Sequence, residues 1–131
     1  MAGLSVVIPT LEEASRLPLL LADLQQWPGE LELIVSDAGS RDQTRVVAQL
    51  AGASVLDNPQ SGRGPQLRWG VDHSSHAWVL VLHADSRLPG SWHQKVARVL
   101  DRPEAHLSAW FFNFNVDACL LYTSPSPRDC Q

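Results

Sequence analysis

"LSVVIPTLEEASRLPLLLADLQQW" (Leu4–Trp27) decides the fold, because it joins a strand pattern to a helix pattern within one short segment. Its first six residues, 4–9, form a compact β-branched apolar run that is typical of a buried strand. From Leu17 onward apolar residues return at helical spacing, and Pro18 suits the first turn of a helix, where its missing N–H is not needed. The stretch therefore predicts a strand followed by a helix.

The same alternation continues along the rest of the chain. Further strands are expected over residues 31–36, 53–56, 77–82 and 107–114. Helices are expected between them, over 40–52, 65–73 and 91–100. The first of these should have Ser40 as its N-cap, Asp42 in its first turn and Gly52 as its stop. Strands that alternate with helices in this way predict a mostly parallel sheet flanked by helices, an α/β architecture.

Composition limits the class of protein. The chain has 131 residues, of which 44% are hydrophobic and 18% charged, as in a single soluble globular domain. The chain has a formal charge of -4, whereas nucleic-acid binding normally requires a basic surface. We therefore expect no nucleic-acid partner. No apolar run approaches the length of a transmembrane segment, and the N-terminus has no basic region of a signal peptide. We therefore expect a cytoplasmic protein.

Polar residues follow the predicted strands, at the sheet edge where ligands bind in parallel α/β folds. Neither of two common phosphate-binding loops is present: "PTLEEAS" replaces the G-x-G-x-x-G pattern after the first strand, and G-x-x-x-x-G-K-[ST] does not occur. A bound phosphate would then need a divalent cation, held by one or two carboxylates and the phosphate oxygens. Asp85 is the best-placed carboxylate for that cation, and Asp37 is placed to accept hydrogen bonds from a base or a ribose.

Four motifs carry a family resemblance: SVVIPTLEEASRLP, IVSDAGSRDQT, SGRGPQLRWG and VLVLHADSRLP. Their order and spacing resemble the nucleotide-binding half of family 2 glycosyltransferases, which have the GT-A fold. The His-Ala-Asp sequence, where most relatives have Asp-x-Asp, is most similar to the radical-SAM/selenodomain-associated transferase subgroup. The resemblance covers Leu4 to about Asp117. It implies a GT-A-like, Rossmann-like sheet that breaks off after about the fifth strand.

The resemblance also implies roles for individual residues in nucleotide binding. Thr10 and Glu12 correspond to residues around the base and ribose, and Asp37 to an acid that hydrogen-bonds the base. Arg63 corresponds to a basic loop residue that contacts base or diphosphate. Two of these positions also have simpler interpretations, because Asp37 could form an Asx-turn over Gly39 and Arg63 could be a solvated loop charge.

The metal site implied by the resemblance centres on Asp85, which corresponds to the last acid of Asp-x-Asp. A Mn²⁺ or Mg²⁺ ion there would stabilise the charge that develops on the leaving nucleoside diphosphate. His83 is a candidate additional ligand, and its nitrogen would favour manganese. Both residues have structural alternatives: Asp85 could cap the turn into RLPG, and His83 could be hydrogen-bonded at a strand end.

The function implied by the resemblance is transfer of a sugar from a nucleoside diphosphate sugar to an acceptor hydroxyl, with inversion. A carboxylate general base would deprotonate the acceptor, and in the family it lies beyond residue 118 of this chain. The sequence is therefore expected to be an enzyme fragment that lacks its catalytic base. The alternatives are a non-catalytic nucleotide-binding fragment or pseudoenzyme, and a GT-A-like nucleotidyltransferase. The sugar, base, acceptor and oligomeric state are not fixed by the sequence.

Residues 119–131, "CLLYTSPSPRDCQ", differ in character from the rest of the chain. They show no helical or alternating periodicity, and CLLYTSPSPRD resembles a translated sequencing adapter. We therefore divide the chain into a nucleotide-sugar-binding region, 1–118, and a non-native tail, 119–131. The alternative is a native disordered tail. Both cysteines, Cys119 and Cys130, fall in this tail.

Overall fold

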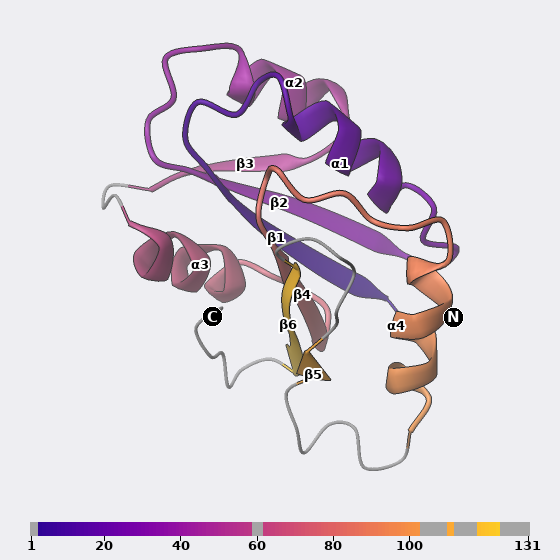
Figure 1. The fold of residues 1–131 in the computed structure, drawn as a ribbon. Helices are drawn as coiled ribbons and strands as arrows, with labels where there is room; N and C mark the ends of the chain where they lie inside the picture. The colour runs from indigo at the N-terminus through magenta and orange to yellow at the C-terminus, as the bar shows by residue number, and fades with distance from the viewer. Residues whose placement is uncertain (1–2, 59–61, 103–109, 112–117, 124–131) are drawn as a thin grey trace.

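The computed structural model describes residues 3–58, 62–102, 110–111 and 118–123. Their strands form one sheet in the order β3-β2-β1-β4-β6-β5 (Figure 1). Four strands are mutually parallel: β1 (Leu4–Thr10), β2 (Leu31–Asp37), β3 (Ser54–Asp57) and β4 (Trp78–Leu82). Two more pair antiparallel beyond β4: β6 (Ala118–Thr123) and β5 (Trp110–Phe111). The predicted parallel α/β architecture is confirmed.

Helices cover both faces of this sheet (Figure 1). They are α1 (Leu17–Leu24), α2 (Thr44–Leu50), α3 (Arg63–Asp72) and α4 (Trp92–Leu100). Residues of α1, α2 and α4 share one buried cluster with β1, β2 and β4, whereas α3 packs on the opposite face. No helix in the described part of the chain is long and apolar enough to cross a membrane.

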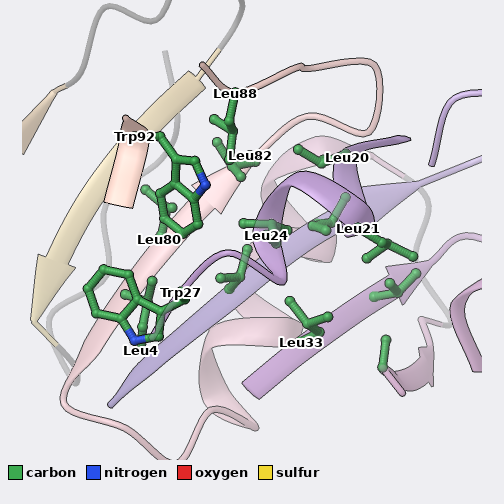
Figure 2. Close-up of a cluster of buried hydrophobic side chains, with 14 of the residues drawn as sticks. Leu4, Leu20, Leu21, Leu24, Trp27, Leu33, Leu80, Leu82, Leu88 and Trp92 are labelled. Carbon is green, nitrogen blue, oxygen red and sulfur yellow. The ribbon is translucent and has the colours of Figure 1, made fainter. Parts of the chain in front are cut away.

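Alternation along the strands separates the two cores. On β1, Val6 and Ile8 belong to the larger cluster, while Val7 packs with Leu67 and Val71 of α3. Figure 2 shows leucines of α1 and the strands enclosing two indoles that come from distant parts of the chain. These rings, of Trp27 and Trp92, stack with centroids 5.7 Å apart. Trp27, Trp78 and Trp92 are all buried in the core.

The start of α2 differs from the prediction. The helix begins at Thr44, so Ser40 is not its N-cap and Asp42 lies ahead of its first turn. Ser40 makes other hydrogen bonds instead: its Oγ accepts from the N–H of Glu12 at 2.9 Å and donates to the carboxylate of Asp37 at 2.6 Å. The predicted stop at Gly52 is confirmed, since its φ of +87° is the left-handed conformation that favours glycine.

The strand β6 was not predicted. No regular structure was expected over residues 119–131, yet residues 118–123 form a strand against β4. The apolar, β-prone segment ACLLYT fits this position because β4 otherwise ends the sheet with an open edge. Of the strand expected over 107–114, only residues 110–111 lie within the described ranges, and they form β5.

Candidate functional site

The carboxyl ends of the parallel strands bring polar side chains together as predicted. The register aligns Thr10 of β1 with Asp37 of β2, and Asp37 with Asp57 of β3. On the other side of β1, the segment 83–85 follows β4. The sheet therefore places polar residues of the first two motifs, Asp57 and the His-Ala-Asp motif along one edge.

Asp37 lies at the centre of this edge and is fully buried. Its Oδ1 accepts hydrogen bonds from the hydroxyls of Thr10 (2.7 Å) and Ser40 (2.6 Å). Its Oδ2 accepts from the backbone N–H groups of Gly39 (3.0 Å) and Ser40 (2.8 Å), and lies 3.4 Å from Nε of Arg45. Since a carboxylate offers about four lone-pair positions, these donors occupy the group. The Asx-turn over Gly39 is confirmed, and contact with a base stays a prediction.

The protonation of Asp37 follows from these contacts. Burial by itself raises the pKa of its carboxyl group. The hydrogen bonds from Ser40, Thr10 and the backbone outweigh that penalty, and the pKa lies below its ordinary value of 3.8. Asp37 is therefore an anion at neutral pH that fixes the loop after β2.

Glu12 joins the loops after β1 and β2, 11–16 and 38–43, in what we call the loop clasp. Its carboxylate accepts from the N–H groups of Arg41 (2.9 Å) and Asp42 (3.1 Å), and its own N–H donates to Ser40 Oγ (2.9 Å). Its φ of +55° is uncommon for a residue with a side chain and costs about 1–3 kcal/mol. Glu12 thus holds the neighbouring loop in this structure, and its predicted contact with a nucleotide stays a prediction.

Two further contacts of the loop clasp join the loop after β1 to Asp42 and to Thr44, the first residue of α2. The N–H of Glu13 donates to Thr44 Oγ1 at 2.9 Å, and that of Ala14 donates to Asp42 Oδ2 at 3.2 Å. Asp42 also accepts from the N–H of Thr44 at 2.9 Å and from its hydroxyl. Asp42 therefore has the structural role expected of it, by a different contact from the one predicted.

Two residues that the sequence analysis did not select hold this edge in place. Gln66 of α3 is buried, and its Nε2 donates to the carbonyls of Thr10 and Ser36, both at 3.0 Å. Arg45 of α2 bridges Asp37 and Asp57, at 3.4 and 3.1 Å. No sequence pattern marked Gln66, because its burial follows from the packing of α3 on the sheet, where its i+4 neighbour Gly70 lies against Val7.

Arg63, the fourth predicted nucleotide-binding residue, begins α3. The backbone places it after residues 59–61, on the helix that carries Gln66. The surroundings of its side chain lie outside the described part of the structure.

Asp85 differs from Asp37 in its surroundings. Its side chain is about half exposed (48%), and Nη1 of Arg16 lies 3.8 Å from its Oδ2. The turn that contains Asp85 is closed by its backbone, with Ser86 N–H donating to the carbonyl of His83 at 3.0 Å. The carboxylate of Asp85 therefore faces solvent at the sheet edge.

The loop that carries Asp85 is anchored to α1. Both carboxylate oxygens of Asp23 accept from the guanidinium of Arg87, at 2.8 and 3.2 Å, and Oδ2 also accepts from Leu88 N–H at 2.9 Å. The indole N–H of Trp92 donates to the Asp23 carbonyl at 2.9 Å. A bidentate arginine–carboxylate pair adds geometric specificity, so this contact fixes the path of the loop.

Within the described ranges, no group of three or more histidine, cysteine or acidic side chains is arranged to hold a metal ion. His83 is partly buried beside the strand end. At the end of β4 the described residues thus offer the half-exposed carboxylate of Asp85 rather than a complete protein cage. His83 as a second ligand stays a prediction.

An apolar groove of about 450 Å³ lies between α1 and α2. Its lining includes no acidic, basic or histidine side chain and none of the predicted site residues: Pro18, Leu21, Ala22, Gln25, Val47, Leu50 and Ala51. Because this groove offers no group for phosphate or metal chemistry, the sheet edge is the candidate site.

Known proteins are similar to this chain in sequence and in fold. The uncharacterized glycosyltransferase Rv0539 of Mycobacterium tuberculosis is 34% identical over 104 residues, which are 78% of this chain and 46% of that protein. Glucosyl-3-phosphoglycerate synthase from Mycobacterium tuberculosis, crystallised with Mn²⁺, UDP and glucosyl-3-phosphoglycerate, superposes with a TM-score of 0.62 at 26% identity. That match covers 76% of this chain and 38% of the synthase.

A third likeness supports the fold alone. S. aureus TarS 1-349 in complex with UDP superposes with a TM-score of 0.68 at 21% identity, over 75% of this chain and 32% of TarS.

The chain spans less than half of the length of the curated relatives it matches, between 26% and 46% of the first ones. Residues 5–120 match the sequence pattern of the family described as Glycosyl transferase family 2. The chain therefore belongs to glycosyl transferase family 2.

Proposed function

We propose that this chain binds a nucleoside diphosphate sugar at the carboxyl edge of its sheet, as the donor-binding part of an inverting glycosyltransferase. The observation that carries the proposal is the contrast between two strand-end acids. Asp37 is buried and occupied by four hydrogen bonds, whereas Asp85 presents a half-exposed carboxylate on the same edge. Only the second can take part in binding a charged ligand without breaking the loop.

The donor set suits a divalent cation whose remaining ligands come from a diphosphate. Magnesium and similar hard cations bind through one or two carboxylates together with substrate phosphates. Asp85 supplies such an oxygen, with the partly buried Glu13 on the neighbouring loop. When bound, the cation would offset the negative charge that develops on the leaving diphosphate. The synthase crystallised with Mn²⁺ and UDP supports this assignment by analogy.

The remaining predicted residues have binding and positioning roles in this proposal. Asp37 and Glu12 hold the loops after β2 and β1 in one fixed arrangement, which would reduce the ordering cost of nucleotide binding. Thr10 fixes Asp37 from the adjacent strand, and Arg63 lies at the start of α3, where a basic side chain would meet base or diphosphate. The general base that deprotonates the acceptor lies beyond residue 118 in the proposal.

Calorimetry tests the proposal directly. UDP, GDP and ADP are titrated into the folded chain with and without MnCl₂, and the titrations are repeated with Asp85→Asn. We expect one nucleotide to bind in a manganese-dependent way and Asp85→Asn to abolish that dependence. Asp72→Asn is the matched control, because Asp72 is an exposed aspartate at the end of α3, outside the proposed site. Absence of metal-dependent binding to all three nucleotides contradicts the proposal.

The non-catalytic alternative requires a different measurement. A pseudoenzyme would bind nucleotide with the same residues but would not transfer sugar even with the complete gene. Donor hydrolysis or transfer by the full-length protein, lost in Asp85→Asn, supports the transferase. Binding without turnover in the full-length parent supports the alternative.

Three further predictions stay predictions. They are membership of the radical-SAM/selenodomain-associated subgroup, a cytoplasmic location, and a non-native origin for residues 119–131. An uninterrupted reading of the gene past the codon for Ala118 tests the last of these. A continuation that encodes CLLYTSPSPRDCQ would show that the tail is native.

A further inference from the structure

Arg16 lies between two carboxylates at the proposed metal site. Its Nη1 is 3.8 Å from Asp85 Oδ2 and 4.0 Å from Glu13 Oε2. Arg16 and Glu13 belong to the loop after β1, while Asp85 comes from the loop after β4. A positive side chain thus lies beside the carboxylate that we propose as the cation ligand.

The pairing of Arg16 with Asp85 follows from how the two segments are joined. Arg16 directly precedes α1, and Asp23 near the other end of that helix holds Arg87, two residues after Asp85, through both carboxylate oxygens. The N–H groups of Arg16 and Leu17 also donate to the carbonyl of Glu13, at 3.1 and 2.9 Å. These contacts keep the base of the Arg16 side chain close to Asp85.

We infer that Arg16 is the resident counter-ion of Asp85 and that it must leave this carboxylate before a divalent cation binds there. The inference rests on the proposed function and concerns how the same site is loaded. Unit charges 4 Å apart in water interact by about 1 kcal/mol, and the repulsion between a guanidinium and a doubly charged ion is about twice that. Arg16 therefore lowers the affinity of the empty site for a cation on its own.

A diphosphate changes this balance. Its oxygens supply ligands for the cation and also accept hydrogen bonds from a displaced guanidinium, which matches phosphate geometry. Arg16 then has an alternative partner once the diphosphate is present. Cation and nucleotide should therefore bind cooperatively, each raising the affinity of the other by the same factor.

The test measures Mn²⁺ binding by the 131-residue chain, using the electron paramagnetic resonance signal of free Mn²⁺. Titrations are made without nucleotide and with saturating UDP, after correction for the Mn²⁺ held by free UDP. For Arg16→Met we expect Mn²⁺ alone to bind about fivefold tighter, the upper range for an exposed ion pair. The factor by which UDP strengthens Mn²⁺ binding should fall correspondingly, and Arg16→Lys should behave as the parent.

Two control variants test whether the gain in Mn²⁺ affinity comes from the pairing of Arg16 with Asp85. Arg98→Met removes an exposed arginine from α4, away from the loop clasp, and should leave Mn²⁺ affinity unchanged. Adding Asp85→Asn to Arg16→Met should abolish the gain. An Arg16→Met chain whose Mn²⁺ affinity is unchanged or weaker, an equal gain in Arg98→Met, or a gain that survives Asp85→Asn would each overturn the inference.

Failure of this inference is separable from failure of the proposed function. Manganese-dependent UDP binding with no effect of Arg16→Met leaves the proposed function intact and removes the counter-ion. Since Arg16 is 62% exposed, its replacement should not affect folding, and the near-ultraviolet circular dichroism of Trp27 and Trp92 checks this.

Discussion

The hydroxyl of Thr10 donates a 2.7 Å hydrogen bond to the buried carboxylate of Asp37, across two parallel strands whose last residues are in register. A buried carboxylate is stable only when hydrogen bonds replace its lost hydration. Thr10 supplies one of them, and its carbonyl also accepts the N–H of Ala38 at 3.0 Å. This pair therefore joins the end of β1 to the start of the loop after β2.

Removing the Thr10 hydroxyl should destabilise the fold. Thr10→Val keeps the shape of the side chain but leaves Asp37 Oδ1 with one donor fewer, at a cost of about 1–3 kcal/mol in the free energy of unfolding. Thr10→Ser keeps the hydroxyl and is the matched control, with a smaller expected loss. Urea denaturation followed by tryptophan fluorescence measures both. Equal losses in the two variants would contradict a role for the hydrogen bond.

Stability should fall in acid because of Asp37. Its pKa in the folded chain lies below the ordinary value of 3.8, since hydrogen bonds from Ser40, Thr10 and the backbone outweigh burial. The unfolded chain therefore takes up protons first as the pH falls. The contribution of Asp37 is complete above about pH 4, the range of an ordinary aspartate, and is lost as the pH falls through its folded pKa.

Asp37→Asn tests this pH dependence. Its unfolding free energy should be lower than that of the parent at pH 7 and should change less between pH 5 and acid, by the reasoning of proton linkage. Some dependence should remain, because hydrogen bonds from Ser5 and Ser75 outweigh burial and lower the pKa of Glu32 at the opposite edge. Parallel pH profiles for parent and variant would show that Asp37 does not cause the effect.

Gln66→Met should destabilise the carboxyl edge without changing the size of the side chain much. The variant leaves the carbonyls of Thr10 and Ser36 without the amide that bonds both, at a cost of about 1–3 kcal/mol. Gln94→Met, at an exposed position of α4, is the control and should stay within about 0.5 kcal/mol of the parent. Thermal unfolding by circular dichroism compares the two. A neutral Gln66→Met would refute the positioning role.

Glu12 offers a test of backbone strain. Glu12→Ala and Glu12→Gly both remove the carboxylate that accepts from Arg41 and Asp42. Only glycine adopts the observed φ of +55° at little cost, so Glu12→Gly should be more stable than Glu12→Ala by about 1 kcal/mol. Urea denaturation of both variants measures the difference. If Glu12→Ala were more stable than Glu12→Gly, the result would contradict a left-handed backbone conformation at residue 12.

The parallel sheet was predictable because its strands are short β-branched runs and its helices have regular apolar spacing. Leu4–Thr10 and Trp78–Leu82 were located to within about a residue on this basis. The position of Asp85 at a strand end followed from the same pattern. Local sequence thus determined which residues reach the sheet edge.

The roles of these residues were harder to predict because they depend on contacts between loops far apart in the chain. Ser40 resembled an N-cap, but its hydroxyl donates a hydrogen bond to Asp37, three residues earlier. Glu12 resembled a ligand-binding acid, yet its partners are the N–H groups of residues 41 and 42. The strand at 118–123 depends on the open edge of β4, which no local pattern reveals.

Helix α1 acts as a rigid strut between two parts of the edge. Its N-terminal side leads into the loop clasp, and Asp23, near its C-terminal end, is bonded to Arg87 and Leu88 in the loop that carries Asp85. A helix of eight residues spans about 12 Å at 1.5 Å per residue, and it does not compress. A rotation of this strut would therefore move both loops together. Substitutions under α1, far from any ligand, should shift the loop clasp and Asp85 together.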